Sequence, residues 1–239
     1  MINAAQEKVS LNSIAGDSWY AKGCNAATVR YCAQVFARHM RTGSCLELGP
    51  AEGLMTAELV KRFEDLTCVD GAEAFCIELR KKYPRITVVN ALFEEYEPNV
   101  NFDHIVLGHV LEHVEDPVSL LRRVREWVSA SGVVLACVPN ARSIHRQLAV
   151  LMGLLETEYS LNDTDRHHGH RRVYNAETLR NDFLHAGFAI EVFGGYWLKP
   201  LSNAQIEATW TPEMVKAAMQ VGERYPDIAA EIYVVARAS

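Results

Sequence analysis

The stretch CLELGPAEGLMTAELVKRF, residues 45–63, joins an apolar run to a segment with helical spacing. The apolar run ends at Gly49, and the helical spacing begins near Leu54. A glycine between a strand and a helix lets the backbone approach a ligand closely, and the first N–H groups of the helix are free to bind it. The stretch therefore predicts a nucleotide-like ligand at the end of a strand.

The glycine spacing separates two classes of nucleotide. The dinucleotide fingerprint G-x-G-x-x-G, aligned on Gly49, requires glycine where the chain has Ala51 and Leu54. The spacing that is present is E-x-G-x-x-x-G, with Glu47 before Gly49 and Gly53 after it. A carboxylate at this place suits a ligand with a positive charge better than it suits a pyrophosphate.

A second acidic residue, Asp70, ends the next apolar run, LTCVD (66–70), and is followed by Gly71. One carboxylate can accept hydrogen bonds from both hydroxyls of a ribose. The two acidic residues together predict a pocket for a ribose and a positive charge. S-adenosylmethionine carries both and has no phosphate.

The apolar pattern alternates strands with helices along the chain. Strands are expected at 44–48, 66–70, 85–91, 102–110, 133–139, 188–193 and 231–237. Helices are expected at 25–41, 53–64, 71–83, 117–132, 144–155 and 176–186, and again from residue 212. Such alternation predicts an α/β fold, with a parallel sheet between helices and ligands at the carboxyl ends of its strands.

Composition disfavours several classes of protein. The 239 residues carry a net charge of −6, whereas general nucleic-acid binders are usually basic. No apolar run approaches the ~20 residues that cross a bilayer, and the first residues lack a signal pattern. We therefore expect a cytoplasmic monomer or homodimer without nucleic-acid or membrane partners. Its six cysteines form no C-x-x-C pair, and we expect them to be buried and reduced.

Six stretches, in this order, resemble class I S-adenosylmethionine-dependent methyltransferases, in particular the small-molecule group typified by ubiquinone-type and sugar methyltransferases. The stretches are LELGPAEG (46–53), CVDGAEAF (68–75), NALFEEY (90–96), FDHIVLGHVLEHVEDPVSLLRRV (102–124), GVVLACVPN (132–140) and GHRRVYNAETLRNDFLHAGF (169–188). The resemblance implies a Rossmann-like three-layer sandwich with seven strands, the last of them antiparallel. It also implies S-adenosylmethionine as cofactor, S-adenosylhomocysteine as product and a small-molecule acceptor.

The resemblance also implies roles for single residues. Gly49 would lie under the methionine part of the cofactor, and Asp70 would bind its ribose. Leu92 and Phe93 would flank the adenine, and His109 would lie near the transferred methyl group.

One position departs from the resemblance, and one segment leaves two interpretations open. The middle glycine of the usual E-x-G-x-G-x-G pattern is Ala51 here, which narrows the room for the cofactor tail. Residues 1–43 are expected to form a helical cover of a single domain. Within it, Trp19 and Tyr20 either close over the cofactor or pack as ordinary core residues.

The polar region 141–175 interrupts the alternation and is expected to act as a substrate lid. Its histidines, with His109, are candidates for the general base, because an ordinary histidine pKa near 6.5 suits that role. These candidates are His109, His167, His168 and His170. The same loop has the donors for a divalent metal, but a polar lid is favoured and no metal is expected. Glu112 and His113 are expected to hold the turn before the next helix.

Four further residues are expected at the acceptor. Arg171 and Arg172 would bind an anionic group of the substrate. Tyr196 and Trp197 follow the pair Gly194-Gly195, which is expected to make a flexible turn at a strand end. These two aromatic residues would line the acceptor pocket.

The sequence thus favours a methyltransferase that acts on an oxygen of a small metabolite, with nitrogen as second choice. Two alternatives stay open. A nicotinamide-dependent oxidoreductase is disfavoured by the glycine spacing, and a non-catalytic S-adenosylmethionine-binding partner protein is disfavoured by the intact acidic pair.

Overall fold

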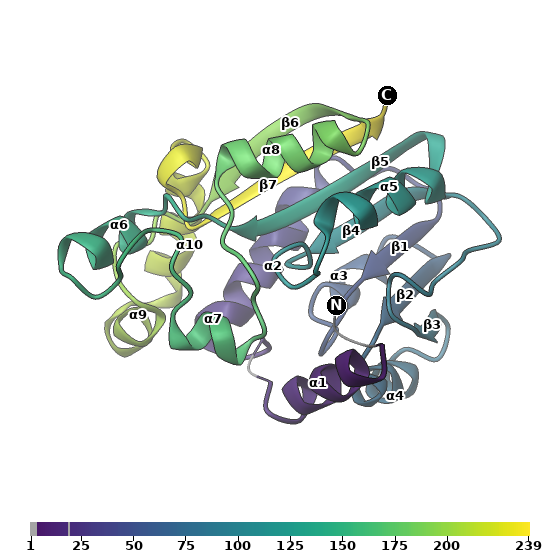
Figure 1. Cartoon of the computed structure of the whole chain (residues 1–239), viewed down its shortest axis with the longest axis horizontal. Helices are drawn as coiled ribbons and strands as arrows, with labels where there is room; N and C mark the ends of the chain where they lie inside the picture. The colour runs from purple at the N-terminus through teal and green to yellow at the C-terminus, as the bar shows by residue number, and fades with distance from the viewer. Residues whose placement is uncertain (1–3, 19) are drawn as a thin grey trace.

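The computed structural model describes residues 4–18 and 20–239 as three layers, with helices on both faces of a seven-stranded sheet (Figure 1). The strands are β1 Cys45–Leu48, β2 Leu66–Asp70, β3 Thr87–Asn90, β4 Phe102–Gly108, β5 Val128–Pro139, β6 Phe188–Tyr196 and β7 Glu231–Ala238. Their order is β3-β2-β1-β4-β5-β7-β6. The strands β1 to β5 are parallel, and β7 is antiparallel to both of its neighbours, β5 and β6. The predicted fold class is therefore confirmed.

The central strands explain the unbroken apolar runs of the sequence. Every residue of β1 and β2 is buried, as expected for parallel strands that helices cover on both faces. Leu48 of β1 pairs in register with Val69 of β2 and with Leu107 of β4. The carboxyl ends of these strands therefore meet at one edge, and this edge carries Asp70 and His109.

Helices complete the outer layers. They are α1 Ala4–Gly16, α2 Gly23–Ala37, α3 Thr56–Leu59, α4 Glu73–Lys82, α5 Pro117–Trp127, α6 Ile144–Leu151, α7 Asp163–His167, α8 Ala176–His185, α9 Asn203–Thr209 and α10 Pro212–Gly222, with a short 3-10 turn at Pro226–Ile228. On one face α5 and α8 pack through Leu121 and Phe183. On the other face α2 and α10 pack through Phe36 and Met219.

Local chemistry sets the start and end of α5. Asp116 accepts a hydrogen bond from the backbone N–H of Ser119 at 2.9 Å, and Pro117 takes the first helical position. The end of the helix differs from the prediction, because the chain turns extended at Val128, which pairs with Phe102 of β4. Gly132, expected to end the helix, therefore lies inside β5.

The prediction of a flexible turn at Gly194-Gly195 is wrong, because both glycines lie within β6. A Cβ added at Gly194 would lie 2.5 Å from the ring of Tyr233 on β7. One added at Gly195 would lie 2.9 Å from the carbonyl oxygen of Glu231. The glycines thus permit the close pairing of two strands rather than a bend.

The interrupted region 141–175 contains α6, which falls within the helix expected at 144–155, and α7, which the polar sequence did not indicate. Arg146 of α6 is buried and holds the region together. Its guanidinium pairs with Asp165 at 3.1 Å and donates to the carbonyl oxygens of Glu158 and Ser160. Polar contacts rather than apolar packing hold α7, so the sequence there lacks the apolar periodicity that would have predicted a helix.

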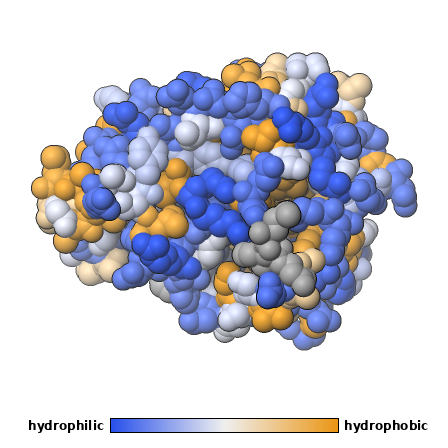
Figure 2. Space-filling model, in the orientation of Figure 1, coloured by the Kyte–Doolittle hydropathy of each residue, from blue (hydrophilic) through white to orange (hydrophobic). Residues whose placement is uncertain are grey.

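The expectation about the thiols is met within the described residues. All six cysteines, Cys24, Cys32, Cys45, Cys68, Cys76 and Cys137, are buried and free. No helix of residues 4–18 and 20–239 is long and apolar enough to span a bilayer. Exposed apolar side chains do gather at the tip of α6, at the left end of the view in Figure 2. They include Leu148, Leu151, Met152 and Leu154.

Candidate active site

A cavity of about 1130 Å³ opens at the carboxyl edge of the sheet. The turns after β1, β2, β4 and β5 form its floor, and α1, α7 and the segment 197–207 close its sides. Leu11 of α1 lies beside Gly71 after β2, whereas His168 and His170 line the half near β4 and β5. The cavity therefore has two ends, which we call the cofactor end and the acceptor end.

Glu47 lies on the floor of the cofactor end and is buried. Its Oε2 accepts hydrogen bonds from Thr56 Oγ1 at 2.7 Å and from Cys68 Sγ at 3.4 Å. Burial raises the pKa of this carboxyl to about 7, although these two hydrogen bonds act in the opposite direction. A positive partner in the cavity would therefore favour the ionised form of Glu47, and Gly49 also lines this part of the cavity.

Asp70 is the second acidic group of the cofactor end. Its Oδ1 accepts from the backbone N–H of Ala72 at 2.8 Å, and its Oδ2 accepts from the N–H of Ala51 at 3.2 Å. Burial raises the pKa of Asp70 to about 6, and the backbone hydrogen bonds lower it again in part. The carboxylate thus ties the turn after β1 to the turn after β2 and fixes its own position.

Most of the residues predicted for the cofactor line this end: Glu47, Gly49, Asp70, Gly71, Leu92 and Phe93. Gly53 does not line it, contrary to the prediction. A Cβ at Gly53 would lie 2.6 Å from Leu79 Cδ2, so this glycine permits the packing of α4 against the turn. Gly71 lies between Leu11 and Leu92, which places α1 directly over the cofactor end.

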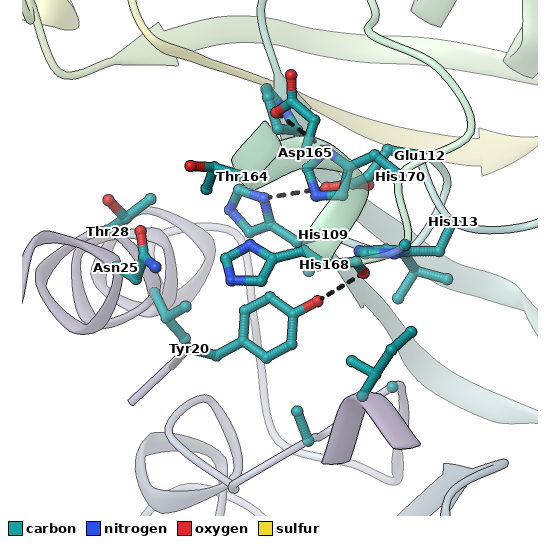
Figure 3. A pocket seen from close by; sticks show the side chains of 18 of the residues that line it. Tyr20, Asn25, Thr28, His109, Glu112, His113, Thr164, Asp165, His168 and His170 are labelled. Atoms are coloured by element: carbon teal, nitrogen blue, oxygen red, sulfur yellow. Dashed lines mark hydrogen bonds and ion pairs between the residues drawn. The ribbon is translucent and has the colours of Figure 1, made fainter. Parts of the chain in front are cut away.

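Tyr20 lies between the two ends and lines the cavity. Its hydroxyl donates to the carbonyl oxygen of His168 at 3.2 Å, and the two rings are 4.6 Å apart (Figure 3). Burial, with Glu112 nearby, raises the pKa of Tyr20 above its usual value, so it stays a neutral donor. Trp19, the other aromatic residue considered for the cover, lies outside the described residues.

His109 follows β4 and adopts a left-handed backbone conformation with φ 60°. Its Nδ1 lies 3.3 Å from Glu112 Oε1, and its Nε2 lies 3.9 Å from Glu231 Oε2 and 3.8 Å from Cys137 Sγ (Figure 3). Burial disfavours the imidazolium, but these neighbours outweigh burial and raise the pKa of His109 well above 6.5. Two acidic groups thus hold the ring between them.

Only some of the other predicted histidines line the cavity. His168 and His170 line the cavity, but His167 does not and lies with its Nε2 3.1 Å from the carbonyl oxygen of Asp17. Burial lowers the pKa of His170, and that of His113 beside it, to about 4. Both rings are therefore neutral near pH 7 and are weak proton acceptors.

Arg171 and Arg172 do not present free guanidinium groups to a substrate, contrary to the prediction. Arg171 pairs with both oxygens of Glu7 at 2.9 Å and donates to the carbonyl oxygen of His113 at 2.6 Å. Arg172 lies outside the cavity and donates to the carbonyl oxygens of the turn after β4, those of Leu111, Val114 and Glu115. The two arginines hold that turn in place.

Tyr196 and Trp197 also differ from each other. Tyr196 is buried and does not line the cavity, because its hydroxyl points to Cys137 Sγ at 3.3 Å. Trp197 does line the acceptor end, with a left-handed φ of 67°. Within the part of the chain that the structure describes, its indole Nε1 has no hydrogen-bond partner. Lys199 Nζ lies 4.8 Å from the centre of its ring.

Sequence reasoning missed Glu231, which lines the acceptor end as the first residue of β7. Burial raises the pKa of its carboxyl to about 7. Its Oε2 is buried, and no hydrogen-bond partner for it exists among residues 4–18 and 20–239. The signal in the sequence was a charged residue at the head of the apolar run EIYVVA, since such a residue ends up at the sheet edge where ligands bind.

The fold and the site define a Rossmann-like ligand-binding domain with two acidic groups at neighbouring strand ends. The family model described as a methyltransferase domain matches residues 21–191, and the chain belongs to this family. The predicted family is thereby confirmed.

Individual proteins agree with this assignment. The chain is 25% identical over 187 residues to a Mycobacterium tuberculosis protein named "Probable S-adenosylmethionine-dependent methyltransferase". The match covers 71% of this chain but only 63% of the relative. The chain therefore spans less than two thirds of the length of that curated relative.

Solved structures share the fold at low sequence identity. The N-methyltransferase NodS from Bradyrhizobium japonicum, solved with S-adenosylhomocysteine, superposes with a TM-score of 0.62 at 14% identity over 99% of both chains. The 1,6-didemethyltoxoflavin-N1-methyltransferase from Burkholderia thailandensis gives a TM-score of 0.63 at 15% identity, over 98% of this chain and 86% of that one.

Proposed function

We propose that the protein transfers the methyl group of S-adenosylmethionine to an oxygen of a small-molecule acceptor. The observation that carries this proposal is the pair of buried carboxyls, Glu47 and Asp70, which line one end of a cavity at adjacent strand ends. A ribose diol and a cationic tail would satisfy the two groups. The names of the Mycobacterium relative and of the ligand in the NodS structure support the same cofactor.

Each part of the cofactor would lie in its own part of the cavity. Asp70 would accept from the ribose hydroxyls, and Glu47 would balance the positive charge of the methionine part. Leu92 and Phe93 offer apolar surface to the adenine, and α1 with Tyr20 closes over the nucleoside. The sulfonium would then point toward His109, where the two ends of the cavity meet.

The chemistry requires alignment and the removal of one proton. The acceptor oxygen forms a bond to the methyl carbon as the carbon–sulfur bond breaks, and neutral S-adenosylhomocysteine leaves. The hydroxyl proton must pass to a base near the methyl group. We assign it to Glu231, which lines the acceptor end and whose pKa near 7 suits a base at neutral pH. His109 would hold that carboxylate in place.

Nitrogen is the alternative acceptor. NodS and the Burkholderia enzyme are both named as N-methyltransferases. The carboxyls of Glu112 and Glu231 at the acceptor end would also attract an amine. Turnover assays with paired alcohol and amine acceptors of the same skeleton would separate the two.

Calorimetry with S-adenosylhomocysteine and with NAD tests the cofactor directly. We expect binding of the first and none of the second. Asp70→Asn should weaken S-adenosylhomocysteine binding by about 10-fold or more, because a hydrogen bond to a charged group contributes about 1.5–3 kcal/mol. Asp65→Asn, an exposed position just before the other end of β2, is the matched control and should leave the affinity unchanged. Equal affinity in the wild-type protein and Asp70→Asn would refute the assignment.

A further inference from the structure

Three potential metal ligands meet at the acceptor end of the cavity, on two segments far apart in the sequence. Glu112 and His113 lie on the turn after β4, and His170 follows α7 (Figure 3). One ligand atom from each of the three lies within 4.8 Å of those of the other two. All three residues line the cavity.

We propose that Glu112, His113 and His170 bind one divalent transition-metal ion, such as Mn²⁺ or Zn²⁺, beside the acceptor. The binding of the ion stands on these three residues alone. Its role in holding an acceptor oxygen rests on the proposed function.

The Glu112 carboxylate has His109 beside one oxygen and, in the described part of the chain, no donor at the other. This residue is fully buried, with 0% of its surface exposed. Its Oε1 lies 3.3 Å from His109 Nδ1, but its Oε2 has no hydrogen-bond partner among the residues that the structure describes. A buried carboxylate oxygen without a donor is costly, and a cation would remove that cost.

The two imidazoles lie in edge-to-face contact at the proposed site. The rings of His113 and His170 are perpendicular, with centroids 4.7 Å apart. The Nδ1 of His170 makes no hydrogen bond within the described chain, and Asp165 Oδ1 lies 3.5 Å from it. A carboxylate beside a ligating histidine is common at metal sites, because it fixes the orientation of the ring.

Hydrogen bonds from two arginines hold the two segments against each other before any ion binds. The backbone N–H of Arg171 donates to the carbonyl oxygen of Glu112 at 2.8 Å, and its side chain donates to that of His113 at 2.6 Å. Together with the contacts of Arg172 to the same turn, these bonds fix the turn after β4 against the segment that carries His170. Arginines that seemed suited to a substrate thus position the candidate ligands instead.

The donor set indicates the class of metal. Two imidazoles and one carboxylate suit Zn²⁺, Mn²⁺ or Fe²⁺, whereas Mg²⁺ and Ca²⁺ prefer oxygen ligands alone. Two ligands at ~2.1 Å in a tetrahedral site lie ~3.4 Å apart, so a pair at the full 4.8 Å would have to close by about 1.4 Å when the ion binds. Three protein ligands leave coordination positions open toward the cavity, where an acceptor oxygen could bind.

Metal binding itself is the test. Chelator-treated protein is titrated with Mn²⁺ and followed by the loss of the free-ion electron paramagnetic resonance signal, with Zn²⁺ calorimetry as a second probe. We expect one ion per chain. His170→Gln and His113→Gln should each weaken binding by at least ~10-fold, because even residues outside a ligand set cost about 10–100-fold.

Two control variants locate the ion. His185→Gln changes an exposed histidine of α8 and should leave the affinity unchanged. Cys137→Ser removes a ligand of the neighbouring group His109, Cys137 and Glu231, and should also leave it unchanged. No Mn²⁺ or Zn²⁺ binding by the wild-type protein, or a loss on Cys137→Ser but not on His170→Gln, would overturn the proposal.

S-adenosylhomocysteine binding by the same samples keeps the two proposals separate and checks that each variant folds. We expect every variant to bind it as the wild-type protein does. A protein that binds S-adenosylhomocysteine but no metal contradicts only the metal site. A protein that binds the metal but no S-adenosylhomocysteine contradicts only the proposed cofactor.

Discussion

The backbone N–H of Ala51 donates to Asp70 Oδ2 at 3.2 Å, and Ala51 holds a left-handed conformation with φ 46°. The residue that departs from the usual glycine pattern thus adopts the backbone conformation that glycine favours. The hydrogen bond links the turns after β1 and β2 and compensates in part for the strain of a side chain in this conformation.

Ala51→Gly is expected to stabilise the protein by about 0.5–1 kcal/mol, because the relief of left-handed strain exceeds the added entropy of the unfolded chain. The change corresponds to a rise in Tm of roughly 1–4 °C for a chain of this size. Affinity for S-adenosylhomocysteine should be kept, since the N–H that holds Asp70 remains. Thermal unfolding measures the first effect and calorimetry the second.

Ala74→Gly serves as the comparison, because Ala74 is exposed within the helix α4. Glycine in place of alanine in a helix costs up to about 1 kcal/mol, so this variant, in the first turn of α4, should melt at a lower temperature than the wild-type protein. If Ala51→Gly lowers Tm as Ala74→Gly does, then the strain at residue 51 is not significant.

Glu47 should make the stability of the unliganded protein depend on pH. Its folded-state pKa of about 7 lies above the ordinary 4.5, so the folded protein binds the proton more tightly than the unfolded chain does. The free energy of unfolding therefore falls as pH rises from about 4.5 to about 7, by at most about 3 kcal/mol from this group. Glu47→Gln should flatten this part of the profile in denaturant titrations.

The same group should release a proton when the cofactor binds. A cationic tail beside Glu47 favours the carboxylate, so S-adenosylmethionine should bind more weakly as pH falls from 7 to 6. Calorimetry in buffers of different ionisation enthalpy measures this proton release near pH 6.5. A wild-type protein that releases no proton, or a Glu47→Gln variant that releases as many, would contradict the role of Glu47.

Glu231→Gln is expected to lower kcat and leave the affinity for S-adenosylhomocysteine unchanged. Loss of a general base typically costs about 10²–10⁴-fold. In the wild-type enzyme, kcat should rise with pH through about 7, because the carboxylate accepts the proton and burial holds its pKa there. The variant should lack this rise.

Glu213→Gln, at an exposed position in the first turn of α10, is the matched control for that experiment. Its kcat and pH profile should equal those of the wild-type enzyme. A Glu231→Gln variant with full activity would exclude Glu231 as the base and return attention to the histidines of the acceptor end.

The sequence alone indicated the cofactor end better than the acceptor end, and the difference has a physical cause. Glu47 and Asp70 each end a short apolar strand, and parallel strands bring such ends together, so their proximity follows from local patterns. Glu231 lies more than a hundred residues away and reaches the cavity only because β7 inserts between β5 and β6. No local pattern carries that strand order.

The contacts of the arginines could not be predicted from the sequence either. The sequence RHHGHRR indicates a positive charge but does not indicate which groups its side chains contact. Whether Arg172 meets a substrate or the carbonyl oxygens of Leu111 and Glu115 depends on where the turn after β4 lies. Only the packed structure places that turn. It leaves His168, His170 and Arg171 lining the cavity, with the guanidinium of Arg171 already paired with Glu7.

Gly194→Ala should destabilise the protein, because its Cβ would lie 2.5 Å from the ring of Tyr233. Tyr233 is buried on β7, so the clash must be relieved by moving the ring or separating the strands. Such overpacking typically costs about 1–3 kcal/mol. Since β7 carries Glu231 into the cavity, methyl transfer should fall as well, while binding of S-adenosylhomocysteine at β1 and β2 should persist. Denaturant unfolding and turnover assays measure the two effects.

Gly16→Ala, where an added Cβ meets no atom within 4 Å, should lower neither quantity. Equal unfolding midpoints for the two variants would show that close β6–β7 pairing does not require glycine at residue 194.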